Sequence, residues 1–356
     1  MLVLTKSRQI EHFLKNAIIS GRWTPGERLP AERELLSELG VSRTTLRDAL
    51  NGLAKDGLIV RSHGSGTYVS TQKTDQHIVI LGETKQLSSK IGYWYNSLVN
   101  EAQRSIEASG YRTVLSIGHG DSEEQFISST NFNDISFLRN TLGVLCLTNP
   151  GILLDRFDQA GILYTTIRSG NPDGRSSVVL DYKRMTSMAA NELHSHGYHD
   201  FAVMYVNRKP EMAGLERMYQ EQKRLINSIV DSNQDRLVPV EWSLNIENAY
   251  DVFKEWWRGP NRTNAIFFYD DSLCSVATRA ILALGIRVPE ELAILTHANV
   301  GRTFQFPVEL TSIGFDASEV VSTAWSMMQD TIKGIDFSDP IRYISPVIQN
   351  GSSLGE

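Results

Sequence analysis

Only two cysteines, Cys146 and Cys274, occur among the 356 residues. They exclude a disulfide framework, a CxxC motif and a zinc knuckle, and their apolar surroundings predict two buried thiols in a reducing compartment. No apolar run reaches the roughly 18 residues of a membrane helix. The amino terminus has no apolar segment behind a basic head, so we expect a cytoplasmic protein rather than a secreted or membrane one.

Signatures of common catalytic sites are missing as well. The sequence contains no GxxxxGK[ST], no GxSxG and no HExxH. His194, His196 and His199 lie close together in the sequence, but no cysteine or carboxylate accompanies them at metal-ligand spacing. We therefore expect no cofactor and no metal.

A basic excess is missing from the chain as a whole, whose net charge is −6. The charges are unevenly divided, however. Residues 1–75 hold 11 Lys/Arg against 8 Asp/Glu, a net of +3, and the remainder holds 24 against 33, a net of −9. A mildly basic head on an acidic body suggests a small polyanion-binding module attached to a second unit.

The first seventy residues have the pattern of three helices followed by a hairpin. Apolar residues recur at helical spacing in three stretches, which are separated by Pro25-Gly26 and Gly40-Val41. Two short strand-like runs, 58–60 and 67–69, flank a tip that contains two glycines. The pattern predicts a winged helix-turn-helix over residues 1–71, followed by a polar linker at 72–77.

Basic and hydroxyl side chains gather at the start of the third expected helix, where free backbone N–H groups and the helix dipole attract phosphates. Arg43 or Arg47 can bind the O6 and N7 atoms of guanine with two hydrogen bonds, which discriminates by about 1–3 kcal/mol. Thr44 and Thr45 suit a phosphate or a thymine methyl group. Arg33, one helix earlier, can reach the DNA backbone.

Four segments of this head, 26–36, 39–50, 57–59 and 63–69, resemble the GntR family of bacterial winged-helix regulators. The resemblance implies that Ser42 and the residues after it contact DNA, and that the wing tip, His63-Gly64-Ser65, enters the minor groove. The alternative is that these are merely solvated polar residues, in which case chance has placed all the parts in the correct order.

Behind the head, short apolar strands alternate with helices. Such alternation predicts an α/β fold whose parallel sheets are covered by helices on both faces. Some 280 residues are long for one open sheet, so we expect two lobes over residues 78–356. The strand-like runs are 78–81, 113–117, 144–147, 162–166, 178–180, 201–206, 265–268 and 292–295, and the helical stretches are 93–109, 153–160, 183–196, 214–233, 249–257 and 272–284.

Segments throughout this body resemble the effector domains of the LacI/GalR family. The segments are 179–182 with 188–198, 216–219, 264–273 with 280–295, and 307–313. The resemblance implies a two-lobed, periplasmic-binding-protein-like fold with three chain crossings and a ligand in the cleft. Head and body together resemble the arabinose-repressor type of hybrid regulator.

The resemblance also implies where an effector binds. Arg217 matches an arginine whose guanidinium group can bridge adjacent sugar hydroxyls. Asp270 and Asp271 match an Asn-Asp pair that accepts hydrogen bonds from sugar hydroxyls. Trp242 matches an aromatic residue that covers the apolar face of a sugar. The remaining candidates are Asn299, Phe315 and the run Tyr93, Trp94 and Tyr95. For the three residues of this run, the alternative is a place in the core.

The sequence departs from the family where Ala298 replaces an acid that usually holds a sugar hydroxyl. Effector identity therefore does not transfer. We expect a homodimer that binds a palindromic operator, represses carbohydrate-utilisation genes and responds to a sugar-like effector. The alternative is an enzyme that processes a sugar or nucleotide and carries an appended DNA-binding module. A periplasmic solute-binding protein is incompatible with the head.

Overall fold

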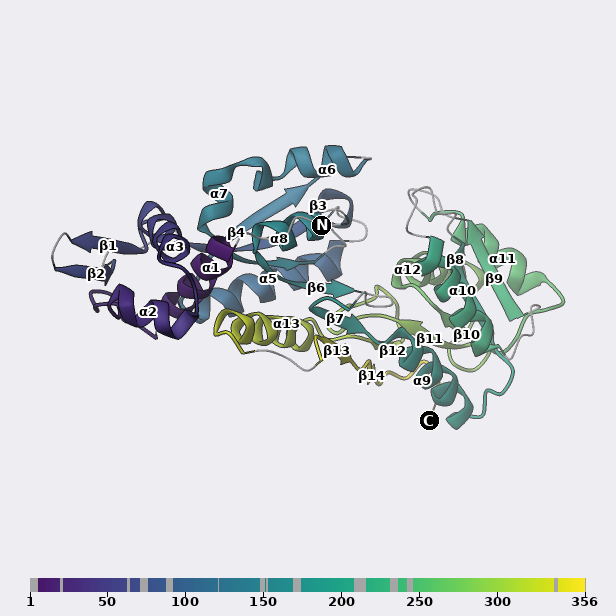
Figure 1. Cartoon of the computed structure of the whole chain (residues 1–356). Helices are drawn as coiled ribbons and strands as arrows, with labels where there is room; N and C mark the ends of the chain where they lie inside the picture. The colour runs from purple at the N-terminus through teal and green to yellow at the C-terminus, as the bar shows by residue number, and fades with distance from the viewer. Residues whose placement is uncertain are drawn as a thin grey trace.

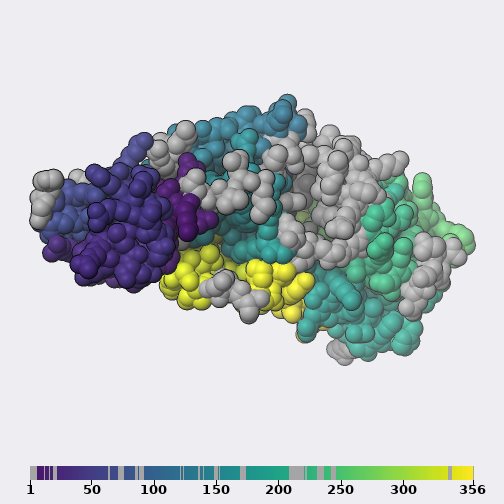
Figure 2. Space-filling model, viewed as in Figure 1, coloured from purple at the N-terminus to yellow at the C-terminus, as the bar shows by residue number. Residues whose placement is uncertain are grey.

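The computed structural model describes residues 6–19, 22–62, 65–70, 76–87, 92–120, 122–147, 151, 153–168, 174–207, 216–230, 236–241, 246–335 and 339–355. It consists of a small head at one end and a body of two lobes, seen in order along the molecule in Figures 1 and 2. The winged helix-turn-helix and the two-lobed α/β body predicted from the sequence are confirmed.

The head packs around its own apolar core, which includes Leu14, Leu35, Leu46 and Leu50. Gly40 ends the second helix at φ 61°, a left-handed conformation that glycine adopts without strain. The tight turn after it sets the third helix against the first two. The head elements are α1 (Lys6–Ile19), α2 (Glu32–Leu39), α3 (Arg43–Lys55), β1 (Ile59–Ser62) and β2 (Gly66–Val69).

Lobe 1 is built on a six-stranded sheet in the order β13-β7-β6-β5-β3-β4, and every adjacent pair is parallel. Ile78 and Ile80 face one core cluster and Val79 and Leu81 the other, as expected for a strand covered on both faces. Its elements are β3 (His77–Glu83), α4 (Thr84–Leu87), α5 (Gly92–Ala108), β4 (Arg112–Gly118), α6 (Glu123–Ser129), η1 (Asn131–Asn133), α7 (Ile135–Asn140), β5 (Thr141–Cys146), α8 (Leu153–Ala160), β6 (Leu163–Arg168), β7 (Ser177–Leu180), α13 (Ala317–Ile332) and β13 (Ile341–Ile344).

Lobe 2 is built on a second six-stranded sheet in the order β14-β12-β11-β10-β8-β9, in which only β14 runs antiparallel to its neighbour. Its elements are α9 (Tyr182–Ser195), β8 (Ala202–Asn207), α10 (Glu216–Ile229), β9 (Leu237–Glu241), α11 (Ala249–Arg258), β10 (Ala265–Phe268), α12 (Asp271–Leu284), β11 (Ala293–His297), β12 (Thr311–Gly314) and β14 (Val347–Gln349).

The chain passes between the lobes three times: after β7, between β12 and α13, and between β13 and β14. The three crossings implied by the family resemblance are therefore present. One core cluster continues through this region and joins Leu180 and Met185 to Phe315 and Ala317. The lobes thus share apolar packing at the hinge.

The domain boundaries proposed from the sequence remain predictions. Residues 72–75 of the expected linker lie outside the described residues, and β3 begins at His77, the last residue assigned to that linker. Cys146 and Cys274 are free and buried, as predicted, and burial raises the pKa of the Cys274 thiol to about 12.

We expect Ser353→Ala to lower the free energy of unfolding by about 1–3 kcal/mol, measured by urea denaturation. The Ser353 hydroxyl is buried, accepts a hydrogen bond from Thr311 N at 2.8 Å and donates to Ile294 O at 2.6 Å, so its loss leaves buried backbone groups unpaired. The exposed Ser187→Ala is the control, with a change within about 0.5 kcal/mol. Equal stability of the two variants would contradict this role.

Candidate functional site

The amino end of α3 carries most of the predicted DNA-binding residues. Ser42 is the N-cap: its Oγ accepts the Thr45 backbone N–H at 3.2 Å and lies 2.8 Å from Thr45 Oγ1. Arg43, Thr44 and Arg47 are exposed on the helix behind this cap. Ser42 and Thr45 therefore shape the helix start, and the neighbouring side chains are open to a duplex.

The second predicted DNA element is the wing. β1 and β2 pair antiparallel, and Ser62 opposite Gly66 closes the register at the tip. The hydroxyl of Tyr68 donates to Ser65 O at 3.1 Å and fixes the last residue of the tip. His63 and Gly64 lie outside the described residues. Arg33, also predicted to contact DNA, is exposed on α2.

Arg61, which the sequence analysis did not single out, joins three elements of the head. It extends from β1 and donates to Asn51 Oδ1 of α3 at 2.6 Å and to Glu32 Oε1 of α2 at 2.7 Å. The side chains of Arg61 and Glu32 are 31% and 41% exposed, so their ion pair adds little to the free energy of folding. Its main effect is to orient β1 relative to α2. Arg61 fixes the wing relative to α3. No local pattern reveals this, because Glu32 is 29 residues away.

In the body, Asp270, Asp271 and Asn299 follow the carboxyl ends of lobe 2 strands, where parallel sheets commonly bind ligands. Asp270 is the N-cap of α12 and accepts from the N–H groups of Ser272 and Leu273 at 2.9 and 3.3 Å. Asp271 forms an ion pair with Arg302 at 2.9 Å between Oδ2 and Nε. The two adjacent carboxylates therefore have different partners: Asp270 binds the backbone of α12 and Asp271 binds Arg302.

Electrostatics at this edge favour neutral groups. Burial and the nearby Asp270 charge raise the pKa of Asp271, although His297 and Arg302 act in the opposite direction. Burial lowers the pKa of His297, against the pull of Asp271, Asp270 and Asn299. The imidazole is therefore held uncharged at neutral pH. Neither His297 nor Arg302 was among the predicted site residues.

Asn299, which is half-buried, and Phe315, which is fully buried, are brought together. The Phe315 backbone N–H donates to Asn299 Oδ1 at 2.8 Å. The Phe315 ring is fully buried, with its centroid 5.1 Å from that of Tyr182. Phe315 thus supports the site wall from behind rather than offering a surface for stacking.

The three aromatic residues predicted for lobe 1 occupy the first turn of α5. Tyr93 is 41% exposed, whereas Trp94 and Tyr95 are partly buried against the main core cluster, which fits the core alternative for those two. A Cβ atom built on Gly301 of lobe 2 would lie only 2.5 Å from Tyr93 Oη. Tyr93 therefore rests on the other lobe where Gly301 leaves room.

Two further predicted effector residues have no described side chain. Trp242 lies outside the described residues, and Arg217 belongs to α10 but nothing of its side chain is described. Their roles stay predictions.

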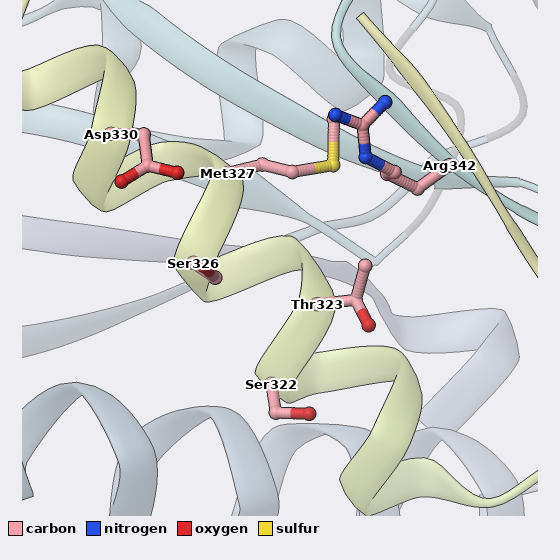
Figure 3. Close-up of a pocket in the computed structure, with 6 residues that line it drawn as sticks. All are labelled: Ser322, Thr323, Ser326, Met327, Asp330 and Arg342. Atoms are coloured by element: carbon pink, nitrogen blue, oxygen red, sulfur yellow. The ribbon is translucent and has the colours of Figure 1, made fainter. Parts of the chain in front are cut away.

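A cavity of about 320 Å³ opens elsewhere, between α13 and the edge strand β13 of lobe 1 (Figure 3). None of the predicted effector residues lines it; the lining residues are Ser322, Thr323, Ser326, Met327, Asp330 and Arg342. We do not assign the effector to this cavity, because it lies away from the carboxyl ends of the lobe 2 strands.

Two kinds of feature are absent from the described part of the chain. There, no three His, Cys, Asp or Glu side chains are grouped as a metal-binding set. Over the same residues, no helix has both the length and the hydropathy needed to cross a membrane.

Comparison with known families supports both parts of this description. The family described as "Bacterial regulatory proteins, gntR family" matches residues 6–69. The family described as "Periplasmic binding protein-like domain" matches residues 176–353, half of the chain.

Individual relatives extend the likeness over most of the molecule. A protein named "Arabinose metabolism transcriptional repressor" from Geobacillus stearothermophilus is 23% identical over 371 residues, covering 98% of each chain. A LacI family transcriptional regulator from Enterococcus faecium, solved with bound ribose, matches 78% of this chain and 98% of its own, with a TM-score of 0.60 and 15% identity. A transcriptional regulator CelR–cellobiose complex matches 88% of this chain and 91% of its own, with a TM-score of 0.59 and 18% identity. The structural likenesses establish the fold.

We expect Arg61→Ala to weaken operator binding several-fold in a gel-shift titration, because the wing loses its tie to α2 and α3. Arg22→Ala is the matched control. It also removes one exposed positive charge and breaks one ion pair of the head, between Arg22 and Glu38 at 2.6 Å, but it touches no wing residue. Equal weakening of operator binding in both variants would mean that Arg61 acts only through its positive charge and not by holding the wing.

We expect Gly301→Ala to weaken effector binding and to enlarge the radius of gyration measured by small-angle X-ray scattering. Gly301 has φ +85°, so an alanine there costs about 1–2 kcal/mol, and its Cβ would push against Tyr93 Oη. Adding Tyr93→Ala should restore the radius but not remove the backbone cost. An unchanged radius in Gly301→Ala would contradict contact between the lobes at this point.

Proposed function

The chain belongs to the periplasmic-binding-protein-like family and carries a head of the bacterial gntR family of regulatory proteins, and from this premise we propose that it is a transcriptional repressor of carbohydrate-utilisation genes. A small, sugar-like effector that binds between the lobes controls its affinity for an operator. The observation that carries the proposal is the combination of an exposed, capped recognition helix with a hinged two-lobed body.

DNA binding is assigned to the amino end of α3, to Arg33 of α2 and to the wing. Arg43 and Arg47 are exposed there and are suited to a bidentate contact with guanine. Thr44 is exposed beside them and suited to a phosphate. The net charge of +3 over residues 1–75 gives one head only modest affinity for the DNA backbone.

We infer that the protein acts as a homodimer on a palindromic operator. Two heads related by two-fold symmetry read two half-sites, so their base contacts add and specificity rises steeply over that of a single head. The protein works in the cytoplasm, where its operator lies.

The effector acts by closing one lobe on the other. A ligand shifts an equilibrium only if it binds one lobe arrangement better, and a coupling of about 1–3 kcal/mol changes operator affinity roughly 5–150-fold. Contact between Tyr93 of lobe 1 and Gly301 of lobe 2 supports this scheme, since the lobes already meet two residues along the chain from Asn299. Relatives named as an arabinose repressor or solved with ribose or cellobiose support a sugar.

We propose that the body binds its ligand without turning it over. If the body were an enzyme, the adjacent carboxylates Asp270 and Asp271 would be its candidates for a general acid and a general base. Asp270 instead caps α12, and Asp271 is paired with Arg302, so each is engaged in holding the fold.

We expect Arg47→Ala to weaken specific operator binding by about 1–3 kcal/mol while leaving effector affinity unchanged. Arg217→Ala should do the reverse: operator binding persists, but the sugar no longer alters it. Gel-shift titrations with and without sugar measure both effects.

The two variants serve as controls for each other, because each removes one arginine from a different part of the protein. Equal losses of DNA and effector binding in both would contradict this division of labour between head and body.

A further inference from the structure

Five buried side-chain atoms among the described residues of lobe 2 have no hydrogen-bond partner: Asn227 Oδ1, Trp256 Nε1, Arg302 Nε, the hydroxyl of Tyr269 and Nε2 of His297. Arg302 Nε faces Asp271 Oδ2 at 2.9 Å as an ion pair. The two atoms that concern us are those of Tyr269 and His297. Tyr269 is only 4% exposed. Leaving a buried donor or acceptor unpaired costs free energy, and native proteins rarely do so without a reason. Neither atom contributes to the contacts described so far.

The two residues are neighbours on one face of the sheet. Tyr269 directly follows β10, His297 is the last residue of β11, and Phe268 pairs with Thr296 in the parallel register between these strands. The next residue on each strand therefore points to the same side. Tyr182 of α9 covers this side, with its ring centroid 5.8 Å from that of His297. Both unpaired atoms thus lie at the carboxyl edge of the sheet, beside Asp271 and Asn299.

The charged groups around these atoms are already engaged. Asp270 caps α12, Asp271 is paired with Arg302, and Glu241 at the end of β9 accepts from Asn207 at 2.6 Å. At the described ends of β9, β10 and β11, the cation Arg302 is already paired with Asp271, so it is not left over to balance an anionic ligand. An anion placed here would lie close to Asp270 and Asp271.

A ligand hydroxyl is the group that matches the two atoms. Tyr269 can donate or accept, and the neutral His297 nitrogen can do either, depending on its tautomer. A hydroxyl both donates and accepts, so it satisfies each of them in any combination, whereas a carboxylate or phosphate only accepts. Two adjacent hydroxyls on a ring could bond both atoms at once.

We propose that Tyr269 and His297 form a hydrogen-bonding subsite for an uncharged polyhydroxyl effector, and that the subsite selects neutral sugars over sugar acids and sugar phosphates. This inference rests on the proposed function of the body as an effector domain. It adds two residues to the effector site and fixes the charge class of the ligand.

The test is isothermal titration calorimetry and thermal melting of the full chain with neutral probes and charged ones. The neutral probes are L-arabinose, D-ribose, lactose and cellobiose, and the charged probes are D-glucuronate and ribose 5-phosphate. We expect at least one neutral probe to bind and both charged probes to fail. Tyr269→Phe, which removes a single oxygen, should weaken the neutral sugar about 5–10-fold, and His297→Phe should weaken it at least as much.

The matched control is Trp256→Phe, since Trp256 Nε1 is also buried and unpaired but belongs to α11 on the opposite face of the sheet. It should leave sugar affinity unchanged. The ligand-free melting temperature of Tyr269→Phe should not fall, because no partner within the protein is lost. A lower value would show that the hydroxyl has a structural partner such as a buried water, and would overturn the subsite.

Three other results would also overturn the proposal: unchanged sugar affinity in both Tyr269→Phe and His297→Phe, binding of charged probes only, or no binding of any neutral probe. Each is distinguishable from failure of the proposed function, which is judged on operator binding by the same protein without sugar. If both variants bind neutral sugar as tightly as the wild type, the proposed function stands and only this subsite is excluded.

Discussion

The two lobes share one apolar core, and the rest of the structure depends on that packing. Three crossings of the chain bring the ends of β7, β12 and β13 into one region, and Leu180, Phe315 and Ile344 are buried there together. Separating the lobes would expose these side chains at about 25 cal/mol per Å². This packing and the three crossings hold the lobes together, which is a property that a clamp around a small ligand requires.

The same region connects the hinge to the candidate site. Phe315 lies at a crossing, its backbone is bonded to Asn299, and its ring packs on Tyr182, which also faces His297. A ligand that bonds His297 is thus linked through Tyr182 to Phe315 at the crossing. Closely packed interiors transmit such displacements because they have few alternative arrangements.

Much of this architecture is visible in the sequence, and the failures have identifiable causes. The strand over 265–268 and the helix over 153–160 match the structure to the residue, because the first is a short continuous apolar run, the second has apolar residues at helical spacing, and both have clear ends. β9 escaped prediction because Pro239 interrupts it, which an edge strand tolerates. α13 was not predicted, although its buried residues have helical spacing. The pairing of Asp271 with Arg302 could not be predicted, because it joins residues that only the folded sheet brings together.

The guanidinium of Arg61 has a consequence for how operators are distinguished. It links the strand that leads to the wing with both helices of the helix-turn-helix, so the wing and α3, the two parts proposed to contact DNA, are mechanically one piece. A base change that alters groove width beneath the wing would tilt α3 as well, and base pairs several positions apart would lose their independence. Scores that add the contribution of each position separately would then misjudge the weaker natural operators.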